Sequence, residues 1–462
     1  MSTYHATLQR PSGLAKALEG KIVIPHHAAF DRARQAWNLA IDQRPSAVVF
    51  PESPEDVATA ILFARDYGQQ VAAQGTGHNA GPLGSLENTI LIKTERMRGV
   101  HIDPRARIAR VDAGVLWQEV VEAAARHGLG AVQGSSPDVG VVGYTIGGGA
   151  SFLGRKYGLS ASRVRAVELV TADGRLVRAD RQHEPDLFWA LRGGGGSFGV
   201  VTQIELELFP ISGIYAGILW YPIERAGEVL HAWRELTHRD VPDQLSTVGR
   251  ILHFPPIPEI PEPVRGQSFA TVEAYHVGNP DEADELLAPL RALGPANDTI
   301  ATISMPALST VHMDPDHPVA GGGDGMMIAE LPPQAVDDWV AVAGAATEFP
   351  LLSVQLRHLE GEFARARPEN GALASIDAKY AMYANGAAPT PELEAKVHAQ
   401  VAKVKRAFHP YAAEHMYLNF AESNRPANTF WTDHAYRRLQ RIKATVDPHD
   451  VIRANHPIAP AR

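Results

Sequence analysis

One segment of the sequence places a histidine among glycines. Residues 74–81 read Gln-Gly-Thr-Gly-His-Asn-Ala-Gly, so His78 stands between Gly77 and Asn79. Glycine permits tight turns and left-handed backbone angles, which lets backbone N–H groups approach a bulky anion closely. An imidazole nucleophile in such a loop favours a cofactor that is held and covalently attached. The alternative is a Gly-rich surface loop with an unreactive histidine, because short glycine motifs often occur by chance.

Two further glycine-rich segments follow, at residues 134–149 and 187–202. Each glycine run costs conformational entropy on folding, and a fold tolerates that cost best where backbone packs against a flat or phosphorylated ligand. The chain has no clean G-x-G-x-x-G between a strand and a helix and no G-x-x-x-x-G-K-[ST]. The three segments therefore favour such a ligand without a Rossmann fold or a P-loop.

The segment around His78 lies at the end of a predicted β-α-β unit. Residues 46–50 form a β-branched run, and Ser53 is a plausible N-cap for the helix that follows. Gly68 ends this helix, and residues 70–73 return as a strand. Residues 74–81, which we call the Gly-His loop, therefore follow directly after the second strand of this unit.

The character of the sequence changes after Pro210. Predicted strands and helices occur here without the regular βαβ alternation of a parallel sheet, which predicts an α+β domain built on an antiparallel sheet. The segments at 351–359, 378–385 and 415–420 (HMYLNF) are predicted strands, and residues 321–325 (GGGDG) are predicted to form a flexible loop.

Composition limits the class of protein. The chain has 462 residues, 45% hydrophobic and 21% charged, which predicts a globular protein of about two or three domains. Its formal charge of −9 argues against nucleic-acid binding, which usually needs a basic face. The absence of cysteine excludes disulfides, Cys-based metal sites and cysteine nucleophiles. No signal peptide or membrane span is recognisable, so a cytoplasmic location is expected.

Seven ordered motifs together resemble one family of flavoproteins. They are QGTGHN, GSSPDVGVVGYTIGGG, RKYGLSASRV, VTADGRLV, DLFWALRGGGGSFGVVT, YLNF and KATVDPHDVIRANHPI. The chain is similar to the vanillyl-alcohol oxidase superfamily, specifically its berberine-bridge-enzyme-like branch, which includes hydroxynicotine oxidases and oxidases of sugars and antibiotics. The resemblance covers residues 46–210 and 417–458 well and the middle third only loosely.

The resemblance implies an α+β fold with a PCMH-type FAD-binding domain formed by both chain ends. We expect this domain at residues 1–210, a substrate-binding domain with an antiparallel sheet flanked by helices at 211–412, and a returning C-terminal segment at 413–462. The implied activity is that of an FAD-linked oxidase, which takes hydride from an alcohol or amine of sugar, alkaloid or secondary-metabolite type and reduces O2 to H2O2. The alternatives are a dehydrogenase with another electron acceptor and a flavin-fold protein without turnover.

The resemblance also implies the cofactor contacts. By its place in the first motif, His78 would form an 8α-histidyl bond to FAD. Bicovalent relatives carry cysteine at the position of Ser136, so this chain is expected to hold its flavin through one bond. Val139 is a small residue at a position where small residues resemble oxidases and leucine resembles dehydrogenases. The other expected contacts are Gly75, Thr76, Gly77, Asn79, Gly143, Gly147, Gly148, Gly149, Gly199, Val200 and Asn419.

FAD would carry the redox chemistry, so the protein must position a C–H bond and remove a proton. The predicted base is Tyr417, with Tyr383 and Gln355 orienting the substrate. Tyr417 and Asn419 lie two apart on a predicted strand and would share a face. A tyrosine base needs a lowered pKa, which a nearby Arg or Lys provides. The alternative is that buried tyrosines only satisfy their hydroxyl groups in the core.

Two polar segments remain outside these assignments. Residues 312–317 (HMDPDH) have a metal-like composition, but Pro315 stiffens them and no second cluster is evident, so a solvated turn without metal is predicted. The basic residues of 437–443 are predicted to form a solvated face near the end of a helix at 434–445. The expected partners are a small-molecule substrate and O2, and the sequence does not indicate an oligomeric state.

Overall fold

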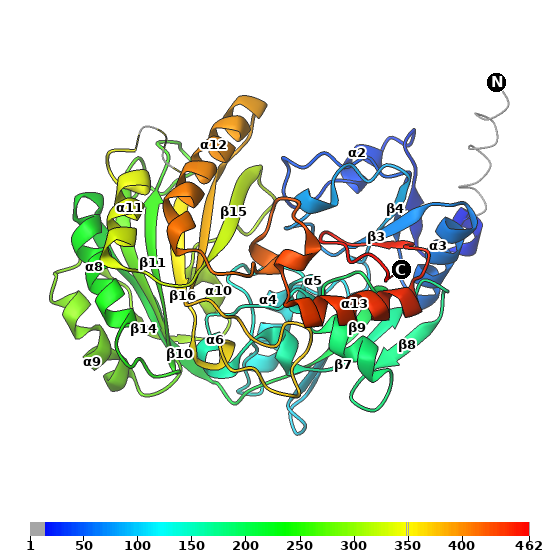
Figure 1. The fold of residues 1–462 in the computed structure, drawn as a ribbon, viewed down its shortest axis with the longest axis horizontal. Coiled ribbons are helices and arrows are strands. Elements are labelled where there is room, and N and C mark those ends of the chain that lie inside the picture. The colour runs from blue at the N-terminus through cyan, green and yellow to red at the C-terminus, as the bar shows by residue number, and fades with distance from the viewer. Residues whose placement is uncertain (1–13, 348, 350, 462) are drawn as a thin grey trace.

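The structure consists of two halves that contain three β-sheets. The computed structural model describes residues 14–347, 349 and 351–461. Early and late segments of the described chain lie together in one half, and the region between them forms the other (Figure 1). The late strand β18 (Ile452–Arg453) pairs in parallel with β3 (Gln70–Gln74), which ties the end of the chain into the first half.

The first half contains two five-stranded sheets. One has the order β1 (Lys21–Val23), β2 (Ala47–Phe50), β4 (Thr89–Lys93), β3, β18. The other has the order β5 (Val100–Asp103), β6 (Ile108–Asp112), β9 (Val200–Glu207), β7 (Val164–Val170), β8 (Leu176–Ala179). The α-helices of this half are α2 (Phe30–Ala33), α3 (Pro54–Asp66), α4 (Trp117–Ala125), α5 (Val141–Ile146), α6 (Gly154–Tyr157), α7 (Pro185–Leu191) and α13 (Asp433–Val446).

The predicted β-α-β unit before the Gly-His loop is confirmed as β2, α3 and β3. The side chain of Ser53 accepts a hydrogen bond from the backbone N–H of Asp56 at 3.2 Å, so it caps the helix as predicted. Val57 and Ile61 of α3 are fully buried in a core that also contains Val71 of β3. This packing holds β3 against the helix and positions the loop that follows it.

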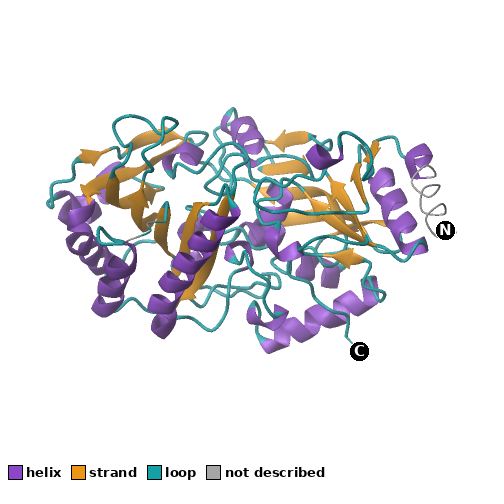
Figure 2. Ribbon diagram, turned by 90° about the horizontal axis from the view of Figure 1, so that it is seen from above, coloured by secondary structure: helices purple, strands orange, loops and turns teal. Residues whose placement is uncertain are grey.

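The second half is built on one antiparallel sheet, which confirms the predicted α+β fold of this region. Its strands run in the order β13 (Asn297–Asp298), β10 (Gly213–Pro222), β12 (Ser268–His276), β11 (Leu245–His253), β16 (Ser353–His358), β17 (Tyr380–Ala387), β15 (Gly321–Ile328), with β14 (Ala301–Ser304) beside β10. Its helices are α8 (Ala226–Thr237), α9 (Pro280–Arg291), α10 (Leu308–Val311), α11 (Pro333–Ala343) and α12 (Pro391–Phe408). Figure 2 shows long helices along one side of this sheet.

The two faces of the large sheet differ in chemistry. The helix-covered face is apolar, and its Tyr380 lies in one buried core with Trp233 of α8 and Trp339 of α11. Cross-strand pairing places the polar residues on the opposite face, because side chains alternate along a strand. Val248 of β11 pairs with Glu273 of β12 and with Arg357 of β16, so these three side chains share a face. Gln355 lies two residues before Arg357 on the same strand and pairs with Arg250 and Tyr383, so these residues lie on that face as well. We call Glu273, Arg250, Gln355, Arg357 and Tyr383 the polar face.

The polar face is turned toward the first half of the molecule. Phe152, which precedes α6, stacks on Tyr275 of β12 with ring centroids 4.0 Å apart. Ser135, from the second glycine segment, lies 3.4 Å from the guanidinium of Arg357. Residues from both halves therefore meet over the polar face.

The prediction of a flexible loop at residues 321–325 is wrong, because these residues begin strand β15. A Cβ atom on Gly325 would lie 2.7 Å from Phe420, and one on Gly323 would lie 2.9 Å from the Tyr383 hydroxyl. The glycines thus allow close approach of neighbouring segments, and the pairing with β17 supplies the backbone hydrogen bonds. The prediction failed because the glycines of residues 321–325 were interpreted as a sign of a flexible loop.

The predicted strand at residues 415–420 is also wrong. Leu418–Phe420 forms a short 3-10 helix, η6. The side-chain amide of Asn79 donates to the carbonyl groups of Leu418 at 3.4 Å and Ala421 at 3.2 Å. These carbonyl groups therefore bond to the Gly-His loop instead of to a neighbouring strand.

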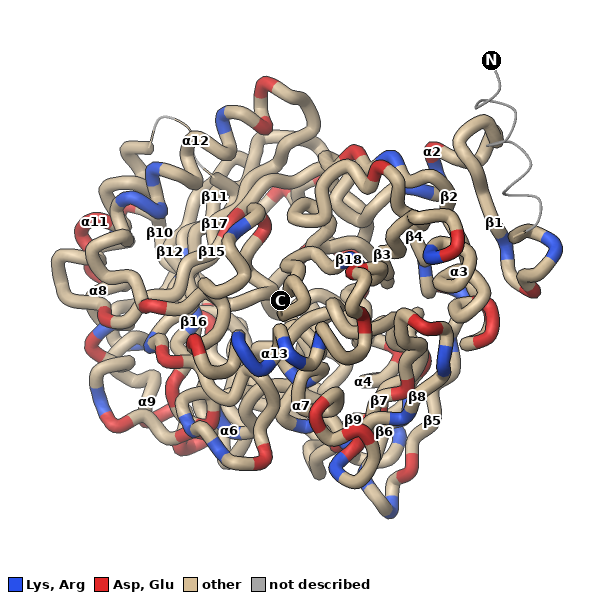
Figure 3. The backbone as a smooth tube through the Cα atoms, turned by 45° about the vertical axis from the view of Figure 1, so that its right-hand side comes forward, with Lys and Arg blue, Asp and Glu red and all other residues tan. Residues whose placement is uncertain are grey.

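Helix α13 confirms the predicted C-terminal helix, and Figure 3 shows basic residues along it. The prediction of a uniformly solvated face is wrong at Lys443, which is fully buried. Its Nζ bonds Asp447 at 2.5 Å and donates to the carbonyl groups of Ser197 at 2.9 Å and Ile452 at 3.0 Å. Lys443 therefore joins α13 to the third glycine segment and to β18. No helix among the described residues is long and apolar enough to cross a bilayer.

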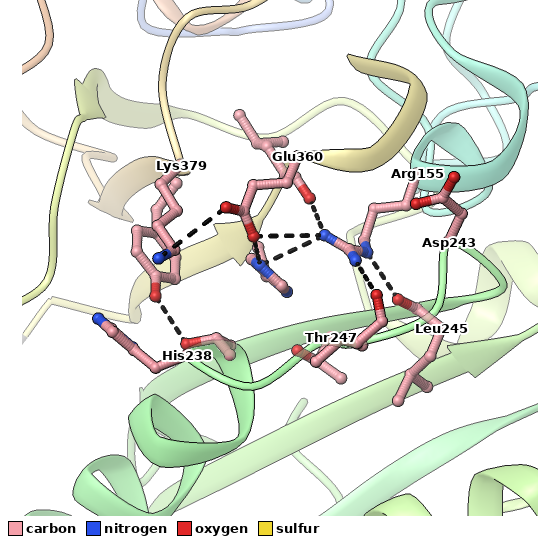
Figure 4. Close-up of polar contacts among 12 residues, drawn as sticks. Arg155, His238, Asp243, Leu245, Thr247, Glu360 and Lys379 are labelled. Carbon is pink, nitrogen blue, oxygen red and sulfur yellow. Dashed lines mark hydrogen bonds and ion pairs between the residues drawn. The ribbon is translucent and has the colours of Figure 1, made fainter. Parts of the chain in front are cut away.

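Arg155 of α6 fastens the first half to the large sheet. It is 2% exposed, and its Nε donates to the carbonyl oxygen of Leu245 at 2.8 Å (Figure 4). Its Nη2 donates to Val241 O at 2.9 Å, and its Nη1 donates to Leu359 O. The carboxylate of Glu360 lies 3.8 Å away, so the buried charge is also partly neutralised.

Replacing Arg155 by methionine is expected to destabilise the protein by about 3 kcal/mol, since each buried carbonyl left without a donor costs about 1–3 kcal/mol. Urea unfolding followed by fluorescence measures the change. The control is Arg175→Met, which removes an exposed ion pair to Asp173 and should cost less than about 1 kcal/mol. Equal losses in the two variants would contradict the role of Arg155.

Candidate active site

The Gly-His loop places the His78 ring in a defined environment. The imidazole stacks on the indole of Trp37 with centroids 4.0 Å apart. Its Nε2 lies 3.2 Å from Asp138 Oδ1, but the two atoms are not aligned for a hydrogen bond, and this buried nitrogen has no other partner among the described residues. The ring is therefore oriented by stacking and lies beside a carboxylate that can take a proton from it.

Asp138 is a functional candidate that the sequence interpretation missed, although it lies two residues after Ser136 in a quoted motif. It accepts hydrogen bonds from Ser136 Oγ at 2.7 Å and from Trp37 Nε1. Burial opposes ionisation, but the nearby His78 and these two donors outweigh it, so the pKa of Asp138 lies below its usual value. The carboxylate is consequently ionised beside the imidazole at neutral pH.

The same loop offers unpaired backbone donors. The backbone N–H groups of residues 76–79 donate to no acceptor among the residues that the structure describes. Gly77 has a φ of +90°, and a Cβ there would lie 2.9 Å from Ala36, so this turn requires glycine. Adjacent free N–H groups in a turn form a site for an anion such as a pyrophosphate.

A cavity of about 630 Å³ lies against this loop and is lined by Gly75, Thr76, Gly114 and Trp37. Positive side chains dominate its charged lining, which contains Lys21, Arg32, Lys93, Arg96, Arg98, Glu95 and Asp138. Positive charge beside free N–H groups fits the phosphate-bearing part of a dinucleotide. The residues present thus suit the predicted FAD at its anionic end.

The second glycine segment meets the segment around Tyr417. A Cβ on Gly147 would lie 1.9 Å from Asn419 Oδ1, and one on Gly148 would lie 2.8 Å from the Tyr417 ring. Asn419 Nδ2 donates to Tyr144 O at 2.9 Å and to the Tyr417 hydroxyl at 3.0 Å. The predicted contacts Gly147, Gly148, Tyr417 and Asn419 are therefore brought together, although not by a strand.

Tyr417 does not have the lowered pKa that the base hypothesis requires. Burial raises the pKa of this hydroxyl, even though Ala150 N and Asn419 donate to it and Arg357 lies in its vicinity. The side chain is 2% exposed, so the charged form would lose most of its hydration. The geometry supports a neutral Tyr417 that orients other groups.

A carboxylate that the sequence interpretation missed lies two residues after η6. The hydroxyl of Tyr383 donates to Glu422 Oε1. Some surface of Glu422 is accessible, but the protein packed around its carboxylate dominates its environment, and burial raises the pKa of this group to about 7. Its backbone N–H donates to Asp324 at 3.1 Å. A carboxyl group with this pKa can accept a proton near neutral pH, and Glu422 is in hydrogen-bond contact with a tyrosine of the polar face.

The acid cluster at residues 312–317 is not a uniformly solvated turn. His317 and Asp316 are exposed, but His312 is fully buried, and its Nδ1 lies 2.7 Å from Glu273 Oε2. Burial lowers the pKa of His312, so the ring is neutral. The pKa of Glu273 falls to about 2 despite burial, because His312, Arg250 and Tyr275 stabilise its charge. The burial of His312 was not predicted because this residue follows α10 and its partner Glu273 lies on the distant strand β12.

The remaining predicted contacts occupy different environments. Gly149 packs against Ser160 and Tyr144, and a Cβ on Gly143 would meet open space. Val139 is partly buried, and its carbonyl accepts from Trp117 N at 3.0 Å. Gly199 and Val200 pack in the core beside Leu169.

Buried polar atoms without partners suit a flat polar ligand between the halves. Such an atom costs about 1–3 kcal/mol unless another group bonds it. Three of them lie in the glycine segments of the first half, His78 Nε2, Asn79 Oδ1 and Tyr144 OH, and two more, Gln355 Oε1 and Arg357 Nε, lie on the polar face, where a substrate could also reach them. The predicted isoalloxazine has donors and acceptors along its polar edge, so the residues present fit it.

Comparison with known proteins agrees with this geometry. A family model described as FAD binding domain matches residues 45–180, and one described as Berberine and berberine like matches residues 416–459. The (R)-6-hydroxynicotine oxidase of Paenarthrobacter nicotinovorans is 28% identical over 96% of this chain and 97% of that protein.

Solved structures show the same architecture. The 6-hydroxy-D-nicotine oxidase from Arthrobacter nicotinovorans matches with a TM-score of 0.79 and 26% identity, covering 96% of this chain and 98% of that one. Physcomitrella patens BBE-like 1 matches with a TM-score of 0.85 and 19% identity over 98% of this chain and 99% of that one. This likeness confirms the predicted fold class, with a PCMH-type FAD-binding domain and a large antiparallel sheet.

Proposed function

Because this chain belongs to the berberine-bridge-enzyme-like family of FAD-linked oxidoreductases, we propose that it is an oxidase that carries FAD on a single covalent bond to His78. It takes hydride from a C–H bond of an alcohol or amine and passes the electrons to O2, which gives H2O2. The observation that carries the proposal is the imidazole of His78, held beside Asp138 and next to unpaired backbone N–H groups.

The chain's own residues would hold the cofactor and move one proton. When bound, FAD supplies an acceptor for the hydride of the substrate C–H bond. Residues 76–79 would bind its pyrophosphate, and Tyr144 and Asn419 line its expected place between the halves. The substrate O–H or N–H would give its proton to the Tyr383 oxygen, whose own proton moves to Glu422. The products are a carbonyl compound or imine and the two-electron-reduced cofactor.

Reaction with oxygen tests the oxidase assignment without a known substrate. The purified holoenzyme is reduced by light with EDTA under argon and then mixed with air-saturated buffer. Rapid return of the oxidised absorbance with one H2O2 per flavin is expected, and Val139→Leu should slow it, since a larger side chain at this position resembles dehydrogenases. A flavin that stays reduced in air but is oxidised by a dye acceptor would instead identify a dehydrogenase. A colourless protein that takes up no FAD would refute the proposal altogether.

A further inference from the structure

Arg357 is held rigidly on the polar face, yet most of its hydrogen-bonding capacity is unused. Its guanidinium lies over the rings of Phe152, at 4.7 Å, and Phe420, at 5.1 Å. Its Nη2 reaches Ser135 Oγ and His312 Nε2, both at 3.4 Å, which are long contacts. Its Nε is buried and has no partner among the described residues.

The surrounding protein does not neutralise this charge. No carboxylate of the described residues forms an ion pair with Arg357. The other arginines near the interface are paired: Arg250 lies 3.2 Å from Glu273 and donates to Ser353 at 2.7 Å, and Arg155 donates to three carbonyl groups. A guanidinium whose Nε is buried without an acceptor is unfavourable. The site therefore favours a ligand that brings an anion.

His312 contributes to this availability. Its Nδ1 is turned to Glu273, so the neutral ring presents Nε2 as an acceptor toward Arg357. This contact positions the guanidinium without cancelling its charge. The planar edge formed by Nε, which has no acceptor among the described residues, and Nη2, which has only long contacts, matches the two oxygens of a carboxylate.

A second unpaired atom lies on the same strand. Gln355 is 3% exposed, and its Oε1 has no donor among the described residues. Residues two apart on a strand share a face and are separated by about 7 Å. Gln355 pairs across the sheet with Tyr383, whose hydroxyl bonds Glu422. The unpaired acceptor therefore lies beside the proposed proton acceptor.

We propose that the substrate is a hydroxy or amino carboxylate whose carboxylate binds Arg357 and whose reacting group lies beside Gln355 with its O–H or N–H donated to the Tyr383 oxygen. This inference rests on the proposed oxidase function. The separation along β16 selects compounds in which several bonds lie between the carboxylate and the reacting group. An α-hydroxy acid is too short to reach both residues.

Calorimetric titration of the holoenzyme tests the anion site. Benzoate is expected to bind at least 10-fold more tightly than benzamide, which has the same shape without the charge. Arg357→Met should weaken benzoate binding by roughly 10- to 100-fold, as expected for a charge-assisted hydrogen bond, and leave benzamide unchanged. Arg357→Lys should restore part of the preference. The control Arg437→Met changes an exposed arginine and should bind benzoate like the wild type.

Matched alcohols test the spacing. Anaerobic flavin reduction by 4-(hydroxymethyl)benzoate is expected to be faster than by 4-(hydroxymethyl)benzamide, and mandelate should give no reduction. Equal behaviour of the acid and the amide in binding and in reduction would overturn the inference. So would an Arg357→Met variant with altered flavin absorbance but unchanged benzoate affinity, because Arg357 would then serve the cofactor.

The inference and the proposed function fail in different ways. A holoenzyme that oxidises neutral alcohols and ignores carboxylates would refute the anion site and leave the oxidase assignment intact. A protein that binds benzoate through Arg357 but holds no flavin would refute the oxidase assignment and keep the anion site.

Discussion

Replacing His78 by alanine is expected to abolish covalent attachment of FAD while the protein still folds and binds FAD reversibly. His78 is the proposed nucleophile, and the chain contains no cysteine that could form a second bond. The unpaired N–H groups of the loop belong to the backbone, so a truncated side chain does not remove them. The ring is also partly exposed, so its loss should disturb the core little.

Acid precipitation followed by absorbance measures this result. Flavin should pellet with the wild-type protein on a peptide that contains His78, and it should remain in the supernatant of His78→Ala. His26→Ala, an exposed histidine of the same half, should retain the attached flavin. Flavin that still pellets with His78→Ala would eliminate the assignment of the bond.

Asp138→Asn probes the environment of the same bond. Asparagine keeps the size of the side chain but cannot take up the proton that the imidazole loses on bonding. Covalent incorporation into apoprotein supplied with FAD should therefore be slower, while the final level can approach that of the wild type. Ser136→Ala removes one of the donors to Asp138 and should have a smaller effect. An Asp138→Asn protein that attaches flavin at the wild-type rate would show that the carboxylate has no part in attachment.

The second large effect is expected at Glu422. Glu422→Gln removes the proposed proton acceptor, and flavin reduction by substrate should slow by about 10²- to 10⁴-fold, the usual contribution of general base catalysis. Because burial raises the pKa of Glu422 to about 7, the wild-type rate should rise with pH as this group ionises around neutrality. The variant should lose this rise. Anaerobic stopped-flow absorbance at a series of pH values measures both effects.

Stability provides the control for this variant. Glutamate in an unfolded chain has a pKa of about 4.3, so the folded protein binds this proton more tightly. The resulting stabilisation is complete below about pH 4 and is lost as pH rises through about 7, a change of up to about 4 kcal/mol. Glu422→Gln stays neutral and should therefore unfold at a higher temperature than the wild type in alkaline buffer.

Tyr383→Phe tests whether Tyr383 passes the substrate proton to Glu422 or only supports the structure. It breaks the contact to Glu422 and should slow flavin reduction, because the substrate proton then has no route to the carboxylate. Wild-type rates and an unchanged pH profile in both variants would show that the pair only supports packing.

The cofactor end of the site could be predicted from the sequence because its requirements are local. A phosphate-binding turn needs glycine at defined positions, and the strand and capped helix before it leave their own patterns in neighbouring residues. The turn at Gly77 and the helix cap at Ser53 were therefore recognisable without a structure. The family motifs extended this interpretation to the segment that contains Asn419.

The substrate end depends on tertiary structure. Glu273, Arg357 and Tyr383 are far apart in the sequence, and only the register of the large sheet brings them to one face. The raised pKa of Glu422 and the lowered pKa of His312 arise from desolvation by segments distant in the chain, which no local pattern records. The sequence alone thus determined where the Gly-His loop turns and presents its imidazole, because backbone geometry is encoded residue by residue. Only the folded sheet decided which charges face the substrate, because side-chain ionisation depends on everything packed around it.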